Sequence, residues 1–274
     1  MEVMTDPKEL YLDLVKKSLT CSLYEGMDGT AWSPRGFLRR WLLKLLAPAD
    51  VRWSKPTQTQ ERSEGLDWPL LAQTMMGFKR LDNLQSCVER ALADQVPGDF
   101  IETGVWRGGA TILMRAILQA YQVKDRTIWV ADSFAGLPRP DAGKYPADAK
   151  DDHYTFAQLA VSLEQVQENF RRYGLLDGQV RFLQGWFKDT LPAAPITALA
   201  VIRLDGDMYE STMDALVNLY PKLAPGGFVI VDDYGAVPAS KAAVHDYRRQ
   251  HGIEDEIQRI DWTGVFWRRE QRGG

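Results

Sequence analysis

The sequence predicts an α/β protein with a mostly parallel sheet and a helical N-terminal extension. From residue 97 onward, short apolar runs alternate with segments of helical periodicity, a pattern typical of a parallel sheet with helices on both faces. The last two apolar runs, at 255–260 and 265–268, are separated by a short turn and predict an antiparallel hairpin at the sheet edge. The chain has 274 residues, enough for one such domain and a substantial extension.

The spacing of apolar residues and the Gly, Pro and Asp residues between them predict each element. We expect parallel strands at 99–103, 127–131, 179–183, 198–204 and 228–231, and helices at 108–121, 161–173, 210–223 and 238–250. In the extension, we expect helices at 8–19 and 36–47, a loop or lid over 48–69, and a helical region over 70–95. A seven-stranded, mostly parallel sheet closed by an antiparallel edge strand is the pattern of class I methyltransferases, which have a Rossmann-like fold.

Charge and composition exclude several classes of function. A net charge of −4 gives no indication of a nucleic-acid partner. The two cysteines, Cys21 and Cys87, lie far apart, which indicates reduced thiols in a cytoplasmic protein. No apolar run approaches the roughly 18 residues needed to cross a bilayer. The basic amphipathic stretch 36–47 is more typical of a core or subunit interface than of a membrane-surface helix, and the acidic N-terminus is not a signal peptide.

The segment 100–110 predicts a ligand-binding turn between a strand and a helix. Its pattern is Glu-x-Gly-x-x-x-Gly-Gly, beginning at Glu102, and it differs from the Gly-x-Gly-x-x-Gly pattern of dinucleotide sites. An acid before the first glycine would repel a pyrophosphate and would suit a cationic ligand. S-adenosylmethionine (SAM) is such a ligand, because it carries a sulfonium and an amine but no phosphate.

Acids at the ends of the predicted strands indicate a binding site at one rim of the sheet. Asp132, thirty residues after Glu102, ends the second strand and could accept hydrogen bonds from both ribose hydroxyls of a nucleoside. The alternative for each single acid is that it caps the following helix. Several like charges on one rim require neutralisation, however, by a cation or by protonation.

A magnesium site is the best explanation for the acids after the fourth and fifth strands. Asp205, Asp232 and Asp233 offer only oxygen ligands, which favour Mg²⁺ or Ca²⁺ over Zn²⁺. Such a metal would lower the pKa of an acceptor hydroxyl, and Asp207 could then remove its proton. The sequence therefore predicts that Asp205 and Asp207 carry the chemistry.

Five motifs together resemble the macrocin O-methyltransferase family, the TylF/MycF/NovP group of Mg²⁺- and SAM-dependent sugar O-methyltransferases from antibiotic pathways. They are Glu-Thr-Gly-Val-Trp-Arg-Gly-Gly (102–109), Val-Ala-Asp-Ser-Phe (130–134), Gly-Trp-Phe-Lys-Asp-Thr (185–190), Leu-Asp-Gly-Asp-Met-Tyr (204–209) and Asp-Asp-Tyr (232–234). The resemblance extends from about residue 8 to 268 and departs over 30–60, where the chain looks longer. It implies an acceptor-pocket cap over 1–96 and a SAM-binding domain over 97–274.

The resemblance also implies roles for single residues. The methionine part of SAM would contact Glu102, Thr103, Gly104, Arg107, Gly108 and Gly109. The ribose would contact Asp132 and Ser133, and the adenine would lie near Gln184, Gly185, Trp186 and Phe187. Thr74 and Met75 would close over the methyl donor. Asp205, Asp232 and Asp233 would bind Mg²⁺, and Asp207 would be the general base. By spacing alone, Trp186 and Phe187 could equally be core aromatics, and Met75 is more typical of packing.

Other functions stay open at this point. An NAD-linked oxidoreductase is disfavoured by the glycine spacing and by the absence of a His, Lys or Tyr-x-x-x-Lys arrangement suited to hydride chemistry. A methyltransferase of phenols or catechols, and a SAM-binding protein without turnover, are alternatives to a sugar O-methyltransferase. We also expect a lid over 135–160, because this long polar stretch contains Pro and Gly, and a homodimer or tetramer, because the N-terminal segment is rich in tryptophan.

Overall fold

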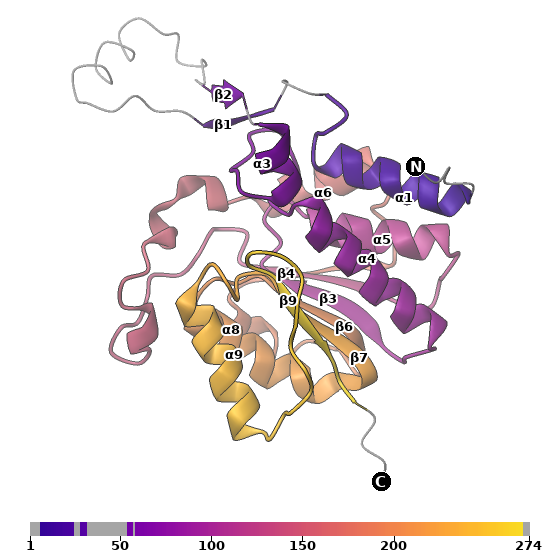
Figure 1. Ribbon diagram of the computed structural model, residues 1–274. Coiled ribbons are helices and arrows are strands. Elements are labelled where there is room, and N and C mark those ends of the chain that lie inside the picture. Colours follow the sequence, from indigo (N-terminus) through magenta and orange to yellow (C-terminus); the bar gives the residue numbers. More distant parts are fainter. Residues whose placement is uncertain (1–5, 25–27, 32–53, 57, 271–274) are drawn as a thin grey trace, which may run out of the picture.

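The computed structural model describes residues 6–24, 28–31, 54–56 and 58–270 (Figure 1). The N-terminal elements are α1 (Pro7–Leu19), β1 (Gly29–Ala31), β2 (Ser54–Pro56), α3 (Thr59–Glu64) and α4 (Phe78–Ala93). The predicted helix 36–47 lies outside the described residues. Two predictions for the extension were wrong, because α3 lies within the expected loop 48–69, and residues 70–77 are not helical.

The sheet has the predicted architecture. Its seven strands lie in the order β5-β4-β3-β6-β7-β9-β8; the first five are parallel, whereas β9 is antiparallel to both β7 and β8. The strands are β3 (Asp99–Thr103), β4 (Ile128–Asp132), β5 (Val180–Gln184), β6 (Leu199–Leu204), β7 (Leu223–Val231), β8 (Gln258–Arg259) and β9 (Val265–Arg268). Strand β7 begins earlier than predicted and contains the Pro-Gly-Gly sequence at 225–227, and β8 is shorter than predicted.

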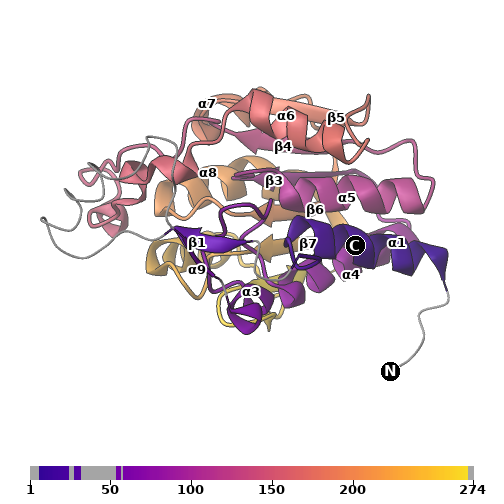
Figure 2. The same cartoon turned by 90° about the horizontal axis from the view of Figure 1, so that it is seen from above.

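Helices cover both faces of this sheet (Figures 1 and 2). On one face, α1 and α4 pack with α5 (Gly109–Ala120) and α6 (Leu163–Arg172) over side chains such as Phe100 and Val130. On the other face, α8 (Tyr209–Leu219) and α9 (Pro238–Gln250) pack over Ile101 and Val229. Successive strand residues contribute to opposite cores because side chains alternate across a strand. No helix in the described part of the chain is long and apolar enough to cross a membrane.

The strand order places a ligand-binding crevice at the carboxyl ends of β3 and β6. The chain proceeds from β3 to β4 and β5 on one side and then returns to β6 and β7 on the other, and ligands of open α/β sheets bind where the order reverses. Gly104, directly after β3, has a φ of +83°, and a Cβ there would lie 1.7 Å from the Asp205 carbonyl oxygen. Only glycine therefore allows the loops after β3 and β6 to approach this closely.

Candidate active site

Two adjoining cavities open at this end of the sheet. The first, of about 140 Å³, lies over the loops after β3, β4 and β5, and we call it the β4-side cavity. The second, of about 310 Å³, lies over the loops after β6 and β7 and beneath residues 65–76, and we call it the acidic cavity. Met75, Trp106, Leu159, Asp205 and Asp207 line both. The arrangement can hold two ligands side by side, with the loop 205–207 between them.

The predicted metal-binding aspartates meet in the acidic cavity. Asp205, Asp232 and Asp233 each offer a carboxylate oxygen, and these oxygens lie within 4.8 Å of one another. The Asp233 carboxylate also accepts a hydrogen bond from the backbone N–H of Asp207 (3.0 Å). Asp207 has a φ of +56°, a conformation that is uncommon outside glycine and that marks a candidate functional turn.

Two buried arginines, which the sequence analysis did not identify, balance part of this negative charge. Arg203, 1% exposed, forms ion pairs with Glu102, Asp205 (2.6 Å) and Asp232. Arg80, on α4, pairs with the other carboxylate oxygen of Asp232 and with Asp261 (3.0 Å). Both oxygens of Asp232 are thus bound to guanidinium groups, and α4 is tied directly to the site.

The remaining imbalance shifts the pKa values of the acids. Burial raises the pKa of Glu102 to about 8, and burial with the charge of Asp205 raises that of Asp207 to about 7. Burial and the charges of Asp207 and Asp205 raise the pKa of Asp233 well above its ordinary value. Asp232 differs: burial alone would raise its pKa, but Arg203 and Arg80 lower it below the ordinary range. The cluster has more carboxylates than positive charges, so a cation would relieve it.

Asp132, at the end of β4, organises the β4-side cavity. One carboxylate oxygen accepts hydrogen bonds from the N–H groups of Val105 (2.7 Å) and Trp106 (3.4 Å), and the other accepts one from Phe134 (2.7 Å). This carboxylate therefore fixes the loops after β3 and β4 instead of capping the helix that follows it, and it also lines the cavity. Both of its oxygens already accept bonds from the chain.

The N-terminal segment 65–77 is held over the site by two arginine side chains. Arg107 donates to the carbonyl oxygens of Pro69 (3.3 Å) and Ala72 (2.6 Å), and Arg62 donates to that of Met76 (2.5 Å). A Cβ on Gly109 would lie 2.4 Å from the Gln73 carbonyl oxygen. Glycine at the start of α5 thus lets this segment approach the site closely.

Most of the residues expected to contact SAM line the cavities. Those that do are Thr74, Met75, Glu102, Gly104, Gly109, Asp132, Ser133, Gly185, Trp186 and Phe187. Four others line neither cavity. Thr103 is buried beneath the rim, Gly108 is the N-cap residue of α5, Arg107 holds the N-terminal segment, and Gln184 pairs with Asp132 in the sheet.

The segment between β4 and α6, for which we predicted a lid, packs beside the site. Asp148, 0% exposed, accepts hydrogen bonds from the N–H groups of Tyr209 (2.7 Å) and Glu210 (3.0 Å), at the start of α8. Trp106 donates from its indole to the Gln158 carbonyl oxygen (2.9 Å). The segment is therefore bonded to the start of α8 through Asp148 and to the loop after β3 through Gln158. Its role as a moving lid stays a prediction.

The sequence contained a signal for one of the two arginines. Arg203 stands inside the apolar run 198–204, two residues before Asp205, and side chains two apart in a strand share a face. A charged residue in a fully buried strand needs a partner. Arg80 offered no local signal, because its partner Asp232 lies 152 residues away.

Known proteins match this chain over nearly its whole length. A family model described as Macrocin-O-methyltransferase (TylF) matches residues 8–269. A demethyldecarbamoylnovobiocin O-methyltransferase of Streptomyces niveus is 59% identical over 261 residues, covering 95% of this chain and 93% of that protein. An 8-demethyl-8-(2,3-dimethoxy-alpha-L-rhamnosyl)-tetracenomycin-C 4'-O-methyltransferase of Streptomyces olivaceus is 54% identical over 264 residues, covering 96% of this chain and 94% of the relative.

A solved structure confirms the predicted class I methyltransferase fold. The O-methyltransferase NovP matches with a TM-score of 0.84 and 50% identity, over 96% of this chain and 100% of that chain. The family match extends through the N-terminal elements as well as the sheet. This chain therefore belongs to the macrocin O-methyltransferase (TylF) family, and it is an enzyme that transfers methyl groups.

Proposed function

We propose that this enzyme transfers a methyl group from SAM to a hydroxyl group of a sugar or glycosylated small molecule, with Mg²⁺ as cofactor. The observation that carries the proposal is the acidic cavity, in which Asp205, Asp232 and Asp233 lie together beside Asp207. The name of the S. olivaceus relative, a methyltransferase of a rhamnosyl-tetracenomycin, supports a glycoside acceptor.

The donor set of the acidic cavity fits Mg²⁺. Two ligands of one Mg²⁺ lie at most about 4.2 Å apart, twice the typical Mg–O distance, and the three candidate oxygens lie within 4.8 Å. Small side-chain movements would bring them into range. Asp205, Asp232 and Asp233 would hold the ion, and its charge would offset the carboxylates that Arg80 and Arg203 leave unbalanced.

The same cavity offers a position for the cationic end of SAM. Glu102 Oε2 is buried and has no hydrogen-bond partner among the described residues, although its side chain lines the acidic cavity. A buried carboxylate oxygen without a donor is costly, and the SAM amine could supply one. The nucleoside would then occupy the β4-side cavity, between Asp132 and Ser133 on one side and Trp186 and Phe187 on the other.

In this arrangement Asp207 removes the proton from the acceptor hydroxyl. It lines both cavities, so it faces the boundary between donor and acceptor, and a pKa of about 7 suits a general base near neutral pH. Mg²⁺ would orient the acceptor and increase the acidity of its hydroxyl. Residues 65–76 cover the acidic cavity and would exclude water during transfer.

We further propose that the extension 1–96 caps the acceptor pocket of a SAM-binding domain, 97–274. Arg80 and the segment 65–76 support this, because both contact the acidic cavity. A homodimer or tetramer is supported by the exposed Leu10 (49%) and Leu14 (53%) on α1. A cytoplasmic location is supported by the two free cysteines.

Methyl transfer from SAM to hydroxylated acceptors tests this proposal. Purified enzyme with Mg²⁺ should methylate demethyldecarbamoylnovobiocin or the rhamnosyl-tetracenomycin of the relative, and EDTA should abolish the reaction. Methylation of simple catechols alone would favour the phenol-directed alternative. SAM binding without turnover on any acceptor would favour a binding protein.

A further inference from the structure

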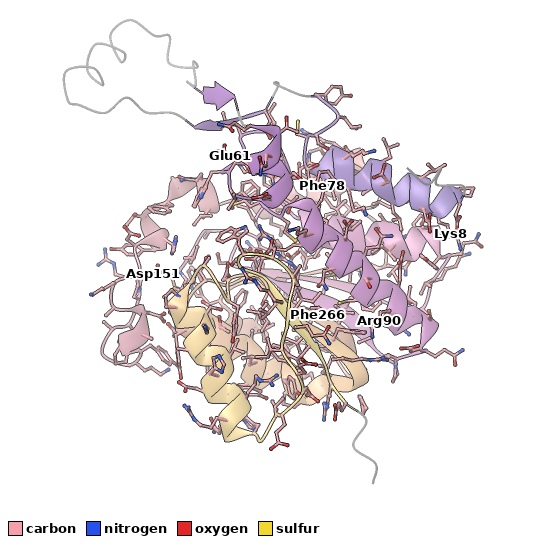
Figure 3. The ribbon with its side chains drawn as sticks, in the orientation of Figure 1. Lys8, Glu61, Phe78, Arg90, Asp151 and Phe266 are labelled. Carbon is pink, nitrogen blue, oxygen red and sulfur yellow. The ribbon has the colours of Figure 1, made fainter. Side chains whose placement is uncertain are left out.

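His153 lies on the wall of the acidic cavity with one ring nitrogen held by a buried acid. Its Nδ1 is 2.8 Å from Asp151 Oδ2, and its backbone N–H donates to Asp151 Oδ1 (3.0 Å). The Asp151 side chain is 7% exposed and lines neither cavity; Figure 3 labels Asp151 on the segment between β4 and α6. One carboxylate thus binds both the backbone and the ring of His153 and fixes the ring's orientation.

The other ring nitrogen, on a side chain that lines the acidic cavity, is available to a ligand. Since the Asp151 carboxylate accepts from Nδ1–H, Nε2 carries the free lone pair of the neutral ring. In the part of the chain that the structure describes, His153 bonds through its backbone N–H and Nδ1, and Nε2 has no hydrogen-bond partner. Phe156 packs edge-on against the ring (5.4 Å between centroids) and in turn packs edge-on against Trp68 (5.8 Å), which also lines the cavity.

A hydroxyl group is the ligand best suited to this nitrogen. Burial disfavours a charged imidazole, but the hydrogen bond with Asp151 and the charge of Asp207 raise the pKa of His153 above its ordinary value. A hydroxyl can donate to the neutral ring and accept from the charged one, so it binds in either state.

We propose that His153 determines acceptor specificity by hydrogen-bonding, through Nε2, a hydroxyl of the acceptor other than the one that is methylated. The inference rests on the proposed function, because it requires a polyhydroxylated acceptor in the acidic cavity. The reacting hydroxyl lies at the loop 205–207, whereas His153 holds the sugar from the segment between β4 and α6. A site built to bind a hydroxyl discriminates against an analogue that lacks it.

The test uses 4-nitrophenyl α-L-rhamnopyranoside and its 2-, 3- and 4-deoxy analogues as probes. Binding is measured by calorimetry in the presence of Mg²⁺ and S-adenosylhomocysteine, so that affinity is separated from methyl transfer, and KM and kcat are measured with SAM. His153→Phe keeps a ring against Phe156 and removes Nε2. His245→Phe is the matched control, because His245 lines neither cavity and its Nε2 already bonds the Tyr234 hydroxyl (2.7 Å).

One deoxy analogue should bind wild-type enzyme about 3- to 10-fold more weakly than the parent rhamnoside, as expected for one lost hydrogen bond. His153→Phe should bind the parent with that same loss and should no longer distinguish the parent from that analogue. It should raise KM more than it lowers kcat, while His245→Phe behaves as wild type.

Two results would contradict the hydrogen bond from His153 without affecting the proposed function. The first is a wild-type affinity of His153→Phe for every rhamnoside. The second is an equal loss of affinity in His153→Phe for the parent and all three analogues, which would indicate a packing role. If wild-type enzyme binds none of the rhamnosides, the contact with a sugar hydroxyl fails together with the glycoside part of the proposed function.

Discussion

Asp132 and Asp232 both lie at the carboxyl ends of parallel strands, yet the chain satisfies their carboxylates in different ways. Asp132 accepts hydrogen bonds from three backbone N–H groups, which carry no net charge. Asp232 is bound by two guanidinium groups, of which Arg203 also pairs with Glu102 and Asp205 and Arg80 also pairs with Asp261. The first arrangement fixes the shape of a cavity, and the second leaves a negative cluster that can accept a cation. We infer that the β4-side cavity binds the nucleoside of SAM by its shape, whereas the acidic cavity supplies the charged groups for methyl transfer.

The largest expected effect separates two acids within the acidic cavity. Asp207→Asn should retain Mg²⁺ and SAM binding and lose kcat by about 10²- to 10⁴-fold, because a general base is removed. Asp205→Asn should lose Mg²⁺ affinity and activity together, with partial recovery at high Mg²⁺. Calorimetry and steady-state kinetics measure both quantities. If Asp207→Asn loses the metal while Asp205→Asn retains it, the two roles are reversed.

Removal of Arg203 should reveal how strongly the cluster depends on its counter-charges. Arg203→Met leaves Glu102 and Asp232 buried with less compensation, so the free energy of unfolding should fall by about 3–5 kcal/mol. Arg171→Met breaks a pair with Glu168 whose side chains are 55% and 48% exposed, and should cost only about 0–1 kcal/mol. Urea unfolding compares the two variants, and equal losses would contradict the importance of the buried network.

Substitution of Asp132 should affect one cavity and not the other. Asp132→Ala removes the acceptor for the loops after β3 and β4, so SAM should bind more weakly by about 1.5–3 kcal/mol. Its Mg²⁺ affinity should stay at the wild-type value, because Asp132 does not line the acidic cavity. Calorimetry with each ligand tests this. Unchanged SAM affinity would remove Asp132 from the donor site, and a loss of Mg²⁺ affinity would show that the cavities are not independent.

The acidic cavity should also make the metal-free enzyme less stable at higher pH. Burial raises the pKa of Glu102 to about 8 and, with Asp205, that of Asp207 to about 7. These two groups keep protons in the folded chain that they lose near pH 4 in the unfolded chain. Their contribution to the free energy of unfolding is therefore fully present at low pH and is lost as the pH rises from about 4 to 8. The slope is at most about 1.4 kcal/mol per pH unit for each proton.

Urea unfolding in EDTA at pH 5, 6.5 and 8 measures this dependence. Glu102→Gln should reduce the slope, because the amide does not titrate. A free energy of unfolding that increases over this range in wild-type enzyme would contradict the pKa directions.

The sheet and the convergence of the aspartates could be predicted from the sequence. Parallel strands place their carboxyl ends on one rim, so acids that follow apolar runs must meet there, as Asp205, Asp232 and Asp233 do. Helix α3 could not be predicted in this way. Its six residues have no apolar periodicity, and its Arg62 is held instead by Asp67 and by the Met76 carbonyl oxygen. These contacts join α3 to residues outside the helix, so they leave no periodic pattern in its sequence.

The charge balance of the site could not be predicted from the acids alone. Acids at the strand ends indicate a bound cation, but the chain itself also supplies two guanidinium groups, both of which pair with Asp232. Arg203 could have been identified from its place within a buried strand. His153 could not: Asp151 is only two residues away, but it is the turns of the segment between β4 and α6 that bring this pair to the acidic cavity.

Direct titration with Mg²⁺ tests the central claim that the acidic cavity is a metal site. Calorimetry at pH 7.5 should show one ion bound per chain in wild-type enzyme, with affinity at least about 10-fold weaker in Asp233→Asn, which loses a charged ligand. Asp132→Asn, in the other cavity, should bind Mg²⁺ as wild type does. Absence of Mg²⁺ binding in wild-type enzyme, or equal affinity in wild type and Asp233→Asn, would contradict the account.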